Sequence, residues 1–251
     1  MPYCGSSSRL RDRPRLSDFE GAVWAILLSM DSIILVDKPK GITSARAVAL
    51  VKKRIKVKVG HTGTLDPLAT GLLIMLTGKR TKQASSFLHM DKSYVVRAIL
   101  GMSTTTYDVA GDVVSKSDRP VTREELESAL EGFLGELMQV PPAFSAKKIG
   151  GKKAYELARK GIDMEIPASQ VRVDSLRLTN FDYPNFTLEC DVSSGFYVRS
   201  LVHDVGQKLG VGATVEEVRR LRVGDYTIDN ARPLDDILLE MSSRLDGAPV
   251  Q

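Results

Sequence analysis

Short apolar runs along the chain predict several β-strands. One is SIILVD at residues 32–37, which ends at a Lys-Pro-Lys-Gly turn because proline cannot continue a central strand. The unbroken run GLLIML at 71–76 predicts a second, buried strand, and the partly alternating KSYVVRAILG at 92–101 predicts a third. Two further runs, VRVDSLRLTNFD at 171–182 and NFTLECDVS at 185–193, have the pattern of paired strands.

Helical segments are marked by capping residues and glycine stops. Thr43 or Ser44 is placed to cap a helix that continues to about Lys53. The segment TREELESALEGFLGEL at 122–137 opens with the capping-box pattern T-x-x-E and predicts a second helix. AYELARKG at 154–161 predicts a short helix that its glycine ends.

Three other segments have less regular patterns. SGFYVRSLVHDVGQKLG at 194–210 is expected to turn from strand into helix, and TVEEVRRL at 214–221 to form one more helix that opens at Thr214. PPAFSAKKIGGKK at 141–153 is rich in proline, glycine and lysine, so we expect a mobile basic loop there.

The order of these segments indicates the fold class. Strands and helices are interspersed without a regular β-α-β repeat, so the sequence predicts an α+β fold, with a central mixed or mostly antiparallel sheet flanked by helices and loops. No internal repeat or low-complexity linker divides the chain after residue 31. We therefore expect one folded domain over residues 31–245, followed by a tail at 246–251.

Residues 1–30 differ in character from the rest. Four arginines precede the apolar stretch AVWAILLSM at 22–30, an order that resembles a signal peptide. However, Asp18 and Glu20 interrupt the approach, the apolar stretch is short, and no small-x-small cleavage site follows. We interpret 1–30 as an upstream start or a poorly ordered extension; a secretory signal and an organelle transit peptide are the alternatives.

Composition argues against several classes of protein. With 251 residues, of which 43% are apolar, the chain can bury a core. Its two cysteines are too few for a disulfide framework and lack metal-ligand spacing, and its three histidines are scattered, which favours a reducing, cytoplasmic location and no bound metal. No segment approaches the roughly 20 apolar residues of a membrane helix. We expect a monomer without membrane contact.

Positive charge is concentrated in one part of the chain. Residues 38–97 hold 13 lysines and arginines but two acids, Asp66 and Asp91, a balance of +11 in a chain whose net charge is +4. Such an excess favours binding to a polyanion, with a merely solvated basic face as the alternative. The lone Asp66 closely follows the densest part, at 52–58, although a carboxylate there weakens phosphate binding.

Asp66 belongs to GHTGTLDP at 60–67, a turn with two glycines. A lone aspartate in a loop is more often a turn or capping residue, but here the glycines let the backbone approach a ligand and Pro67 stiffens the next position. No second acid at short spacing supports a two-carboxylate glycosidase, and the chain has no GxxxxGK[ST], GxGxxG or HExxH motif. What remains is a single carboxylate, ionised at neutral pH, that acts as a nucleophile beside a polyanion-binding surface.

These segments together resemble a known family. GHTGTLDPLATGLL, preceded by VDKPKGITS, is similar to the two signature segments of the TruB family of RNA pseudouridine synthases. The resemblance continues through KSYVVRAILGMSTTTYDVAGDV, PPAFSAKKIGGKKAYELARKGI and GFYVRSLVHDVGQKLGVGA, and covers roughly residues 33–231. It implies a pseudouridine synthase fold and isomerisation of the T-loop uridine, position 55 of tRNA, by an enzyme that binds the T-arm and uses no metal or organic cofactor.

The resemblance also implies roles for individual residues. Asp66 matches the family's catalytic carboxylate, and His61 the residue that fills the gap left by the flipped base. Tyr94 matches the aromatic residue that stacks on the uracil. Tyr197 and Arg199 match a Y-x-R pair, in which the arginine pairs with the catalytic carboxylate.

Further positions are matched less specifically. Val218 falls where relatives commonly have leucine in the pocket wall, and Lys38 and Pro39, from the first signature, are expected to shape the site rather than to react. Taken singly, each matched residue has an ordinary structural interpretation, such as a core tyrosine or a surface arginine; only their joint spacing favours the functional one.

Two features depart from the family pattern, and two alternative functions stay open. The chain stops where bacterial relatives commonly continue into an RNA-binding domain of PUA type, so we expect retained catalysis with weaker, more salt-sensitive tRNA binding. The family supplies nothing for residues 1–30. The alternative functions are a non-catalytic RNA-binding or tRNA-folding module of the same fold, and a synthase that acts on another RNA.

Overall fold

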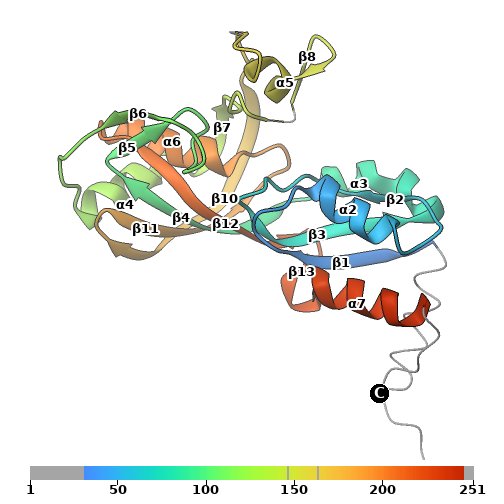
Figure 1. The fold of residues 1–251 in the computed structure, drawn as a ribbon. Coiled ribbons are helices and arrows are strands. Elements are labelled where there is room, and N and C mark those ends of the chain that lie inside the picture. Colours follow the sequence, from blue (N-terminus) through green and yellow to red (C-terminus); the bar gives the residue numbers. More distant parts are fainter. Residues whose placement is uncertain (1–30, 146, 163, 246–251) are drawn as a thin grey trace, which may run out of the picture.

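A long, twisted sheet runs through the molecule (Figure 1). The computed structural model describes residues 31–145, 147–162 and 164–245; the predicted extension at 1–30 and the tail at 246–251 lie outside the described residues. Within the described part the main sheet has ten strands. Side by side, they are β14 (Arg232–Pro233), β1 (Ile33–Lys38), β3 (Thr70–Thr77), β12 (Ala213–Val223), β4 (Lys92–Leu100), β11 (Asn185–Val192), β10 (Ser169–Asp182) and β7 (Gly135–Gln139), with β2 (Val59–His61) beside β3 and β13 (Tyr226–Thr227) beside β12.

The sheet is mixed, as predicted. The pairs β1–β14 and β3–β12 are parallel, and the other neighbours are antiparallel. Helices and short 3₁₀ turns lie around it. They are α2 (Ser44–Lys52), η1 (Gly78–Gln83), α3 (Ala84–Leu88), α4 (Arg123–Glu131), α5 (Ala154–Ala158), α6 (Val198–Lys208), η2 (Ile228–Asn230) and α7 (Leu234–Leu245). The α+β class predicted from the sequence is confirmed.

Alternating side chains of β1 and β3 fill two hydrophobic clusters. Ile34 and Leu73 belong to the larger cluster, together with residues of α2, α6 and α7, while Leu72 and Ile74 belong to a smaller one that includes Phe87 of α3. Burial on both faces explains why the sequence of β3 is an unbroken apolar run rather than an alternating one.

The start of α2 was predicted to be capped by Thr43 or Ser44. Thr43 is the cap, since its side-chain oxygen accepts a hydrogen bond from the Arg46 N–H at 3.0 Å. The hydroxyl of Ser44 instead makes contacts with another segment. It is buried, and it bonds the backbone of Leu65, the residue before Asp66, at 2.8 and 3.0 Å.

The segment TVEEVRRL was predicted to be a helix, and this is wrong: it lies inside β12, between β3 and β4. The register of β12 against β4 shifts between Val215 and Glu217 and again between Arg220 and Arg222. Each irregularity adds a residue to one strand, so buried Val215 and Val218 are three positions apart, a spacing that is typical of helices.

The helix predicted over 122–137 is shorter than expected. Its capping box is present, with the Thr122 hydroxyl accepting from the Glu125 N–H and the Glu125 carboxylate from the Thr122 N–H. The helix ends at Glu131, because Gly132 follows it and residues 135–139 pair with β10 as β7.

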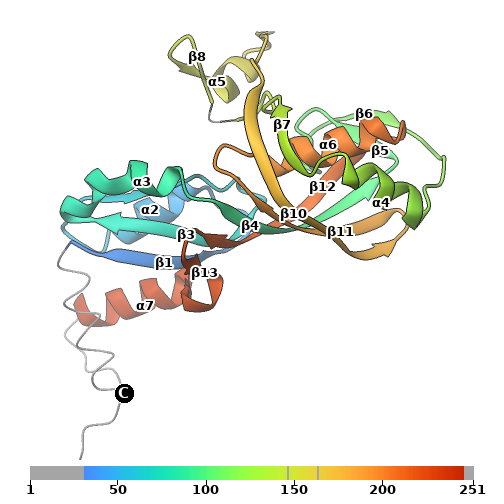
Figure 2. The same cartoon turned by 180° about the vertical axis from the view of Figure 1, so that it is seen from behind.

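The basic stretch at 141–153 contains short regular structure rather than only a loop. Strands β8 (Lys148–Ile149) and β9 (Lys152–Lys153) form a small hairpin that leads into α5. A second hairpin, β5 (Met102–Thr104) with β6 (Val113–Lys116), follows β4. Figures 1 and 2 show β8 and α5 standing above the sheet, where β10 rises from it. Among the described residues, no helix is long and apolar enough to cross a membrane.

Gly71 allows the parallel strands β3 and β12 to approach each other. Its φ is +98°, and a Cβ atom there would lie 2.3 Å from the carbonyl oxygen of Arg220. We expect Gly71→Ala to lower the free energy of unfolding by more than about 2 kcal/mol, because it adds backbone strain and a clash with a backbone atom. Chemical denaturation measures this.

Gly60→Ala is the matched control, since a Cβ atom at Gly60 would meet nothing within 4 Å. It should change the free energy of unfolding by less than about 0.5 kcal/mol. Equal decreases for the two variants would contradict the role assigned to Gly71.

Candidate active site

A cavity of about 510 Å³ opens over the central strands β4 and β12. Five of the predicted site residues line it: Asp66, Tyr94, Tyr197, Arg199 and Val218. They come from the turn between β2 and β3, from β4, from the start of α6, and from β12. The fold thus brings together residues that are far apart in the sequence.

The turn that carries Asp66 is fixed by the chain segment after β1. Besides the bonds between Ser44 and Leu65, the N–H of Gly41 donates to the carbonyl of Pro67 at 2.7 Å, and the N–H of Ala69 donates to the carbonyl of Asp66 at 3.1 Å. The two signature segments of the sequence are therefore one structural unit. The Asp66 side chain stays 44% exposed, which leaves one side of the carboxylate open to the cavity.

Arg199 holds the Asp66 carboxylate from the opposite wall. Its Nη2 lies 2.8 Å from Asp66 Oδ2 and donates to the carbonyl of Phe144 at 2.8 Å. Its Nη1 donates to the carbonyl of Thr106 at 2.8 Å and lies 3.5 Å from the buried carboxylate of Asp108. The predicted ion pair is present. The Arg199 side chain is 8% exposed, and both of its Nη atoms have hydrogen-bond or ion-pair partners.

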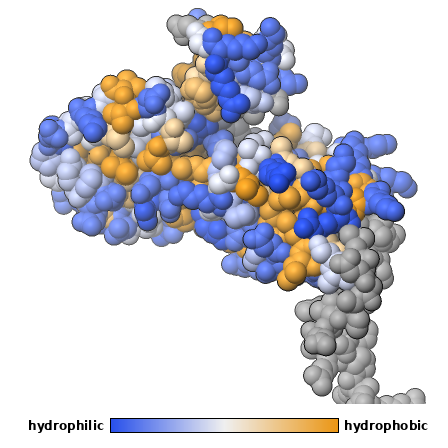
Figure 3. Space-filling model, viewed as in Figure 1, coloured by the Kyte–Doolittle hydropathy of each residue, from blue (hydrophilic) through white to orange (hydrophobic). Residues whose placement is uncertain are grey.

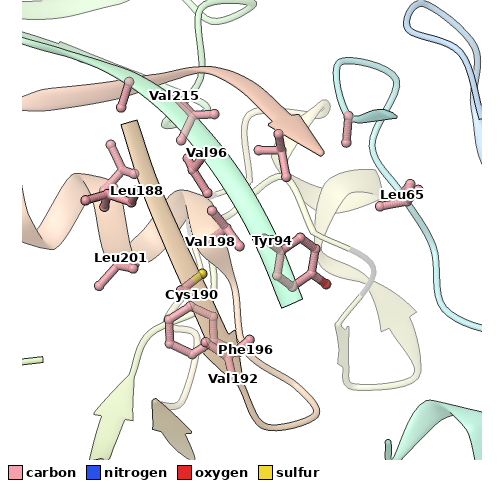
Figure 4. Packing of buried hydrophobic residues seen from close by; sticks show 14 of the residues in the cluster. Leu65, Tyr94, Val96, Leu188, Cys190, Val192, Phe196, Val198, Leu201 and Val215 are labelled. Carbon is pink, nitrogen blue, oxygen red and sulfur yellow. The ribbon is translucent and has the colours of Figure 1, made fainter. Parts of the chain in front are cut away.

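Tyr94 forms the boundary between the cavity and the hydrophobic core. In Figure 4 its phenol oxygen points away from Cys190 and Phe196, toward the side on which Leu65 lies. Burial raises the pKa of this phenol, and the neighbouring Arg220 guanidinium acts in the opposite direction. The ring is therefore placed as an apolar wall with a neutral polar tip.

Tyr197 occupies the N-cap position of α6, two residues before Arg199. Its backbone N–H and carbonyl both bond the side-chain amide of buried Gln139, at 2.8 and 3.0 Å. The Ser200 hydroxyl donates to the carbonyl of Val140 at 2.7 Å. The end of β7 therefore sets the position of the helix that carries Arg199.

Three predicted residues do not line the cavity. Lys38 is fully buried beside the turn, where its Nζ donates to the carbonyls of Pro39 and Ile42 at 2.8 Å each. Burial lowers the pKa of Lys38 to about 8, although the charge of Asp66 opposes this shift. Pro39 is exposed. His61 is half-buried on β2, and burial followed by the charge of Arg220 lowers its pKa. The gap-filling role of His61 stays a prediction.

Sequence reasoning missed several residues that build this site. Ser44, Asp108, Gln139 and Arg220 hold the others in place, and Arg220 also lines the cavity. Ser44 had a signal only as a possible helix cap, and Gln139 only as a polar residue just after a predicted helix and shortly before two prolines. The contacts of the others cross between distant segments. Among the described residues, no group of three or more His, Cys, Asp or Glu side chains is arranged to hold a metal ion.

Comparison with family models gives two matches that together cover most of the chain. Residues 50–198 match the model described as TruB family pseudouridylate synthase, N-terminal domain. Residues 199–246 match the model described as tRNA pseudouridylate synthase B C-terminal domain.

Several curated proteins are similar over most of their length. A protein of Aquifex aeolicus named tRNA pseudouridine synthase B is 45% identical over 212 residues, which is 83% of this chain and 74% of the relative. A protein of Chlamydia abortus with the same name is 46% identical over 214 residues, which is 84% of this chain and 89% of the relative.

Solved structures show the same fold. A chain in the crystal structure of a Cbf5-Nop10-Gar1 complex superposes with a TM-score of 0.70 at 27% identity, over 90% of this chain. A chain in the structure of an H/ACA RNP bound to a substrate RNA containing 2′-deoxyuridine superposes with a TM-score of 0.66 at 25% identity, also over 90%. This chain spans 59% and 58% of those two chains, respectively.

The contact between Gln139 and Tyr197 can be tested by one isosteric change. In Gln139→Glu a carboxylate oxygen replaces the amide that donates to the Tyr197 carbonyl, so a buried acceptor faces another acceptor. We expect the free energy of unfolding to fall by about 1–3 kcal/mol, as measured by chemical denaturation.

The same change at exposed Gln207, on α6, is the control and should alter the free energy of unfolding by less than about 0.5 kcal/mol. A Gln139 variant as stable as the Gln207 variant would show that the bond does not position the helix.

Proposed function

The chain belongs to the TruB family of pseudouridylate synthases, and we propose that it isomerises the T-loop uridine at position 55 of tRNA, with Asp66 as the reacting carboxylate. The observation that carries the proposal is the Asp66 side chain, held by Arg199 at the edge of a cavity whose wall includes Tyr94. The relatives named tRNA pseudouridine synthase B support tRNA as the substrate.

The chemistry fits a site with one reacting carboxylate. Pseudouridine forms when the N1–C1′ bond of a uridine breaks, the uracil turns, and C5 bonds C1′, so no group enters or leaves. Attack on C1′, attack on C6 and a glycal route each use a single carboxylate beside the ribose and the base. Arg199 keeps the Asp66 carboxylate oriented. The positive charge of Arg199 also compensates the negative charge of this partly buried carboxylate.

The target uridine must leave the base stack before Asp66 can reach it. Flipping costs a few kcal/mol, and stacking on an aromatic ring returns roughly 1–3 kcal/mol per base. In our proposal Tyr94 provides that ring and Val218 another part of the wall, since both line the cavity. In the same proposal His61 fills the gap that the flipped base leaves in the RNA stack.

Exposed cations gather around α2 and η1. We name them the α2–η1 patch: Lys52, Lys53, Lys56, Lys58, Lys79, Arg80 and Lys82. The patch comes from two segments, residues 52–58 and 79–82. These segments are adjacent, because the Gly78 N–H donates to the Lys58 carbonyl at 2.8 Å. Figure 3 shows hydrophilic residues over this region and over the β8–α5 segment above the sheet. In the proposal both surfaces contact the phosphates of the T-arm.

Two alternatives give different outcomes. A non-catalytic RNA-binding module of this fold needs the basic surface but not the Asp66–Arg199 pair. A synthase for another RNA needs both; one solved relative is named as bound to a substrate RNA in an H/ACA particle. Mapping pseudouridine in cellular tRNA with and without the protein separates the two targets.

Asp66→Asn tests the assigned chemistry. An amide cannot act as nucleophile, so we expect pseudouridine formation in a T-arm RNA to fall by more than about 1,000-fold, while RNA binding changes little. The rate is measured by nuclease digestion and mass spectrometry of the RNA, and binding by filter retention.

The matched control is Asp91→Asn, the other acid of the basic segment, whose side chain is 44% exposed and pairs with exposed Arg172. Its rate should stay within about twofold of the wild-type rate, as expected for a surface ion pair. An active Asp66→Asn variant would refute the proposed mechanism and favour the non-catalytic alternative.

The α2–η1 patch makes a separate prediction about salt. Replacing Lys53 and Lys56 together by glutamine should reduce the slope of log K against log salt concentration by about 0.7–0.9 for each lysine that binds a phosphate. The rate at saturating RNA should remain unchanged. Lys116→Gln, on exposed β6, is the control and should leave the slope as it is in wild type. If the double variant has the same slope as this control, Lys53 and Lys56 do not bind RNA.

A further inference from the structure

Arg220 is a buried cation without a carboxylate partner among the described residues. Only 1% of the residue is exposed, yet it lines the cavity. Its neighbours on β12 differ: Arg219 pairs with Asp37 at 2.6 Å, and Arg222 with Asp191 at 2.9 Å. Burying a guanidinium costs several kcal/mol unless a charge compensates it, so an unpaired one suggests a function.

The side chain of Arg220 is fixed in the floor of the cavity. Its Nε donates to the carbonyl of Leu72 at 2.8 Å, and its Nη2 donates to the carbonyl of Gly63 at 3.1 Å, in the turn that carries Asp66. These bonds satisfy donors but do not neutralise the charge. Because the residue is held from two sides, it cannot swing outward to reach an RNA phosphate.

The charge of Arg220 lies beside the surface on which the uracil is expected to stack. Arg220 and Tyr94 are direct partners in the register of β12 and β4, and such cross-strand neighbours have Cβ atoms about 4.5–5.5 Å apart. Burial is the largest cause that lowers the pKa of His61 and of Lys92, and the charge of Arg220 is the second largest. Lys92 is itself buried and lines the cavity, so two cations lie beside this surface.

We propose that the unpaired guanidinium of Arg220 stabilises the negative charge that develops on the uracil ring while the ring is detached from the sugar. This inference rests on the proposed function, because it takes the cavity beside Asp66 to be the uracil site. It assigns Arg220 a part in the reaction that is separate from binding RNA and from orienting Asp66.

The electron balance of the isomerisation requires such a charge. When N1–C1′ breaks, its electron pair stays with the uracil and spreads over N1 and the two carbonyl oxygens, while C1′ becomes electron-poor. When C5 then bonds C1′, C5 supplies the electron pair and the ring becomes neutral; the C5 proton is then lost and N1 gains a proton, so that the net change is a proton shift from C5 to N1 and the aromatic ring is restored. A fixed positive charge in a dry site lowers the energy of the detached anion without having to reorganise.

The test compares Arg220→Gln and Arg220→Lys on two RNAs. One T-arm RNA carries uridine at the target position, and the other carries 5-fluorouridine, whose detached ring is a weaker base and needs less stabilisation. Single-turnover loss of the target nucleoside is measured for both. We expect Arg220→Gln to react about 10–100-fold more slowly than wild type on uridine, and Arg220→Lys, which keeps the charge, to recover at least about threefold of that loss.

We call the factor by which Arg220→Gln is slower than wild type on a given RNA its deficit. The decisive quantity is how this deficit changes between the two RNAs. On 5-fluorouridine the deficit of Arg220→Gln should shrink by about threefold or more, while RNA affinity stays within about twofold. If a variant is partly unfolded, the ratio of its rates on the two RNAs still holds, because the same preparation meets both. An equal deficit on both RNAs would mean a merely structural Arg220, and no deficit would mean no role; either overturns the inference. Wild-type protein inactive on both RNAs would instead refute the proposed function.

Discussion

The ion pair between Asp66 and Arg199 is the contact at which the separate parts of the site meet. Asp66 comes from a turn fixed by the start of α2, whereas Arg199 comes from the start of α6, fixed by the end of β7. The same guanidinium bonds the carbonyls of Phe144 and Thr106. A buried arginine can make all these contacts only if each segment is in place, so one side chain couples four distant parts of the chain.

This coupling explains how a single carboxylate keeps one orientation in a basic environment. Left alone among cations, Asp66 could pair with any nearby lysine, and its direction would vary. Arg199 is 8% exposed and already held by carbonyls, and therefore offers Asp66 one fixed geometry. The second carboxylate, Asp108, is in turn fixed by the Thr106 hydroxyl at 2.6 Å and the Ala110 N–H at 3.0 Å. The orientation of the Asp66 carboxylate is thus determined by its surroundings rather than by Asp66 itself.

The sequence predicted best what local patterns determine. The strand at Ile33–Lys38, the cap at Thr43 and the capping box at Thr122 follow from hydrophobic spacing and hydrogen bonding within a few residues. TVEEVRRL was mistaken for a helix because irregular pairing with β4 disturbs the alternation of a strand, and pairing is not visible in one segment. Candidate site residues such as Asp66 and Arg199 were predicted through resemblance to a family, whereas Asp108 and Arg220 are defined by contacts across the fold, which no local pattern records.

The charges around the cavity show why strand β12 can carry so many ionised residues. Glu216, Glu217 and Arg219 each pair with an opposite charge on a neighbouring segment, at 2.6, 3.1 and 2.6 Å, so they link β12 to its surroundings. Arg220 faces the cavity instead, where its guanidinium bonds two backbone carbonyls and, within the described part of the chain, no carboxylate. Together with buried Lys92, which also lines the cavity, it leaves the floor of the site positive despite Asp66. A site with this imbalance favours an occupant that brings or develops negative charge, and a uracil that leaves its sugar does so at the moment of reaction.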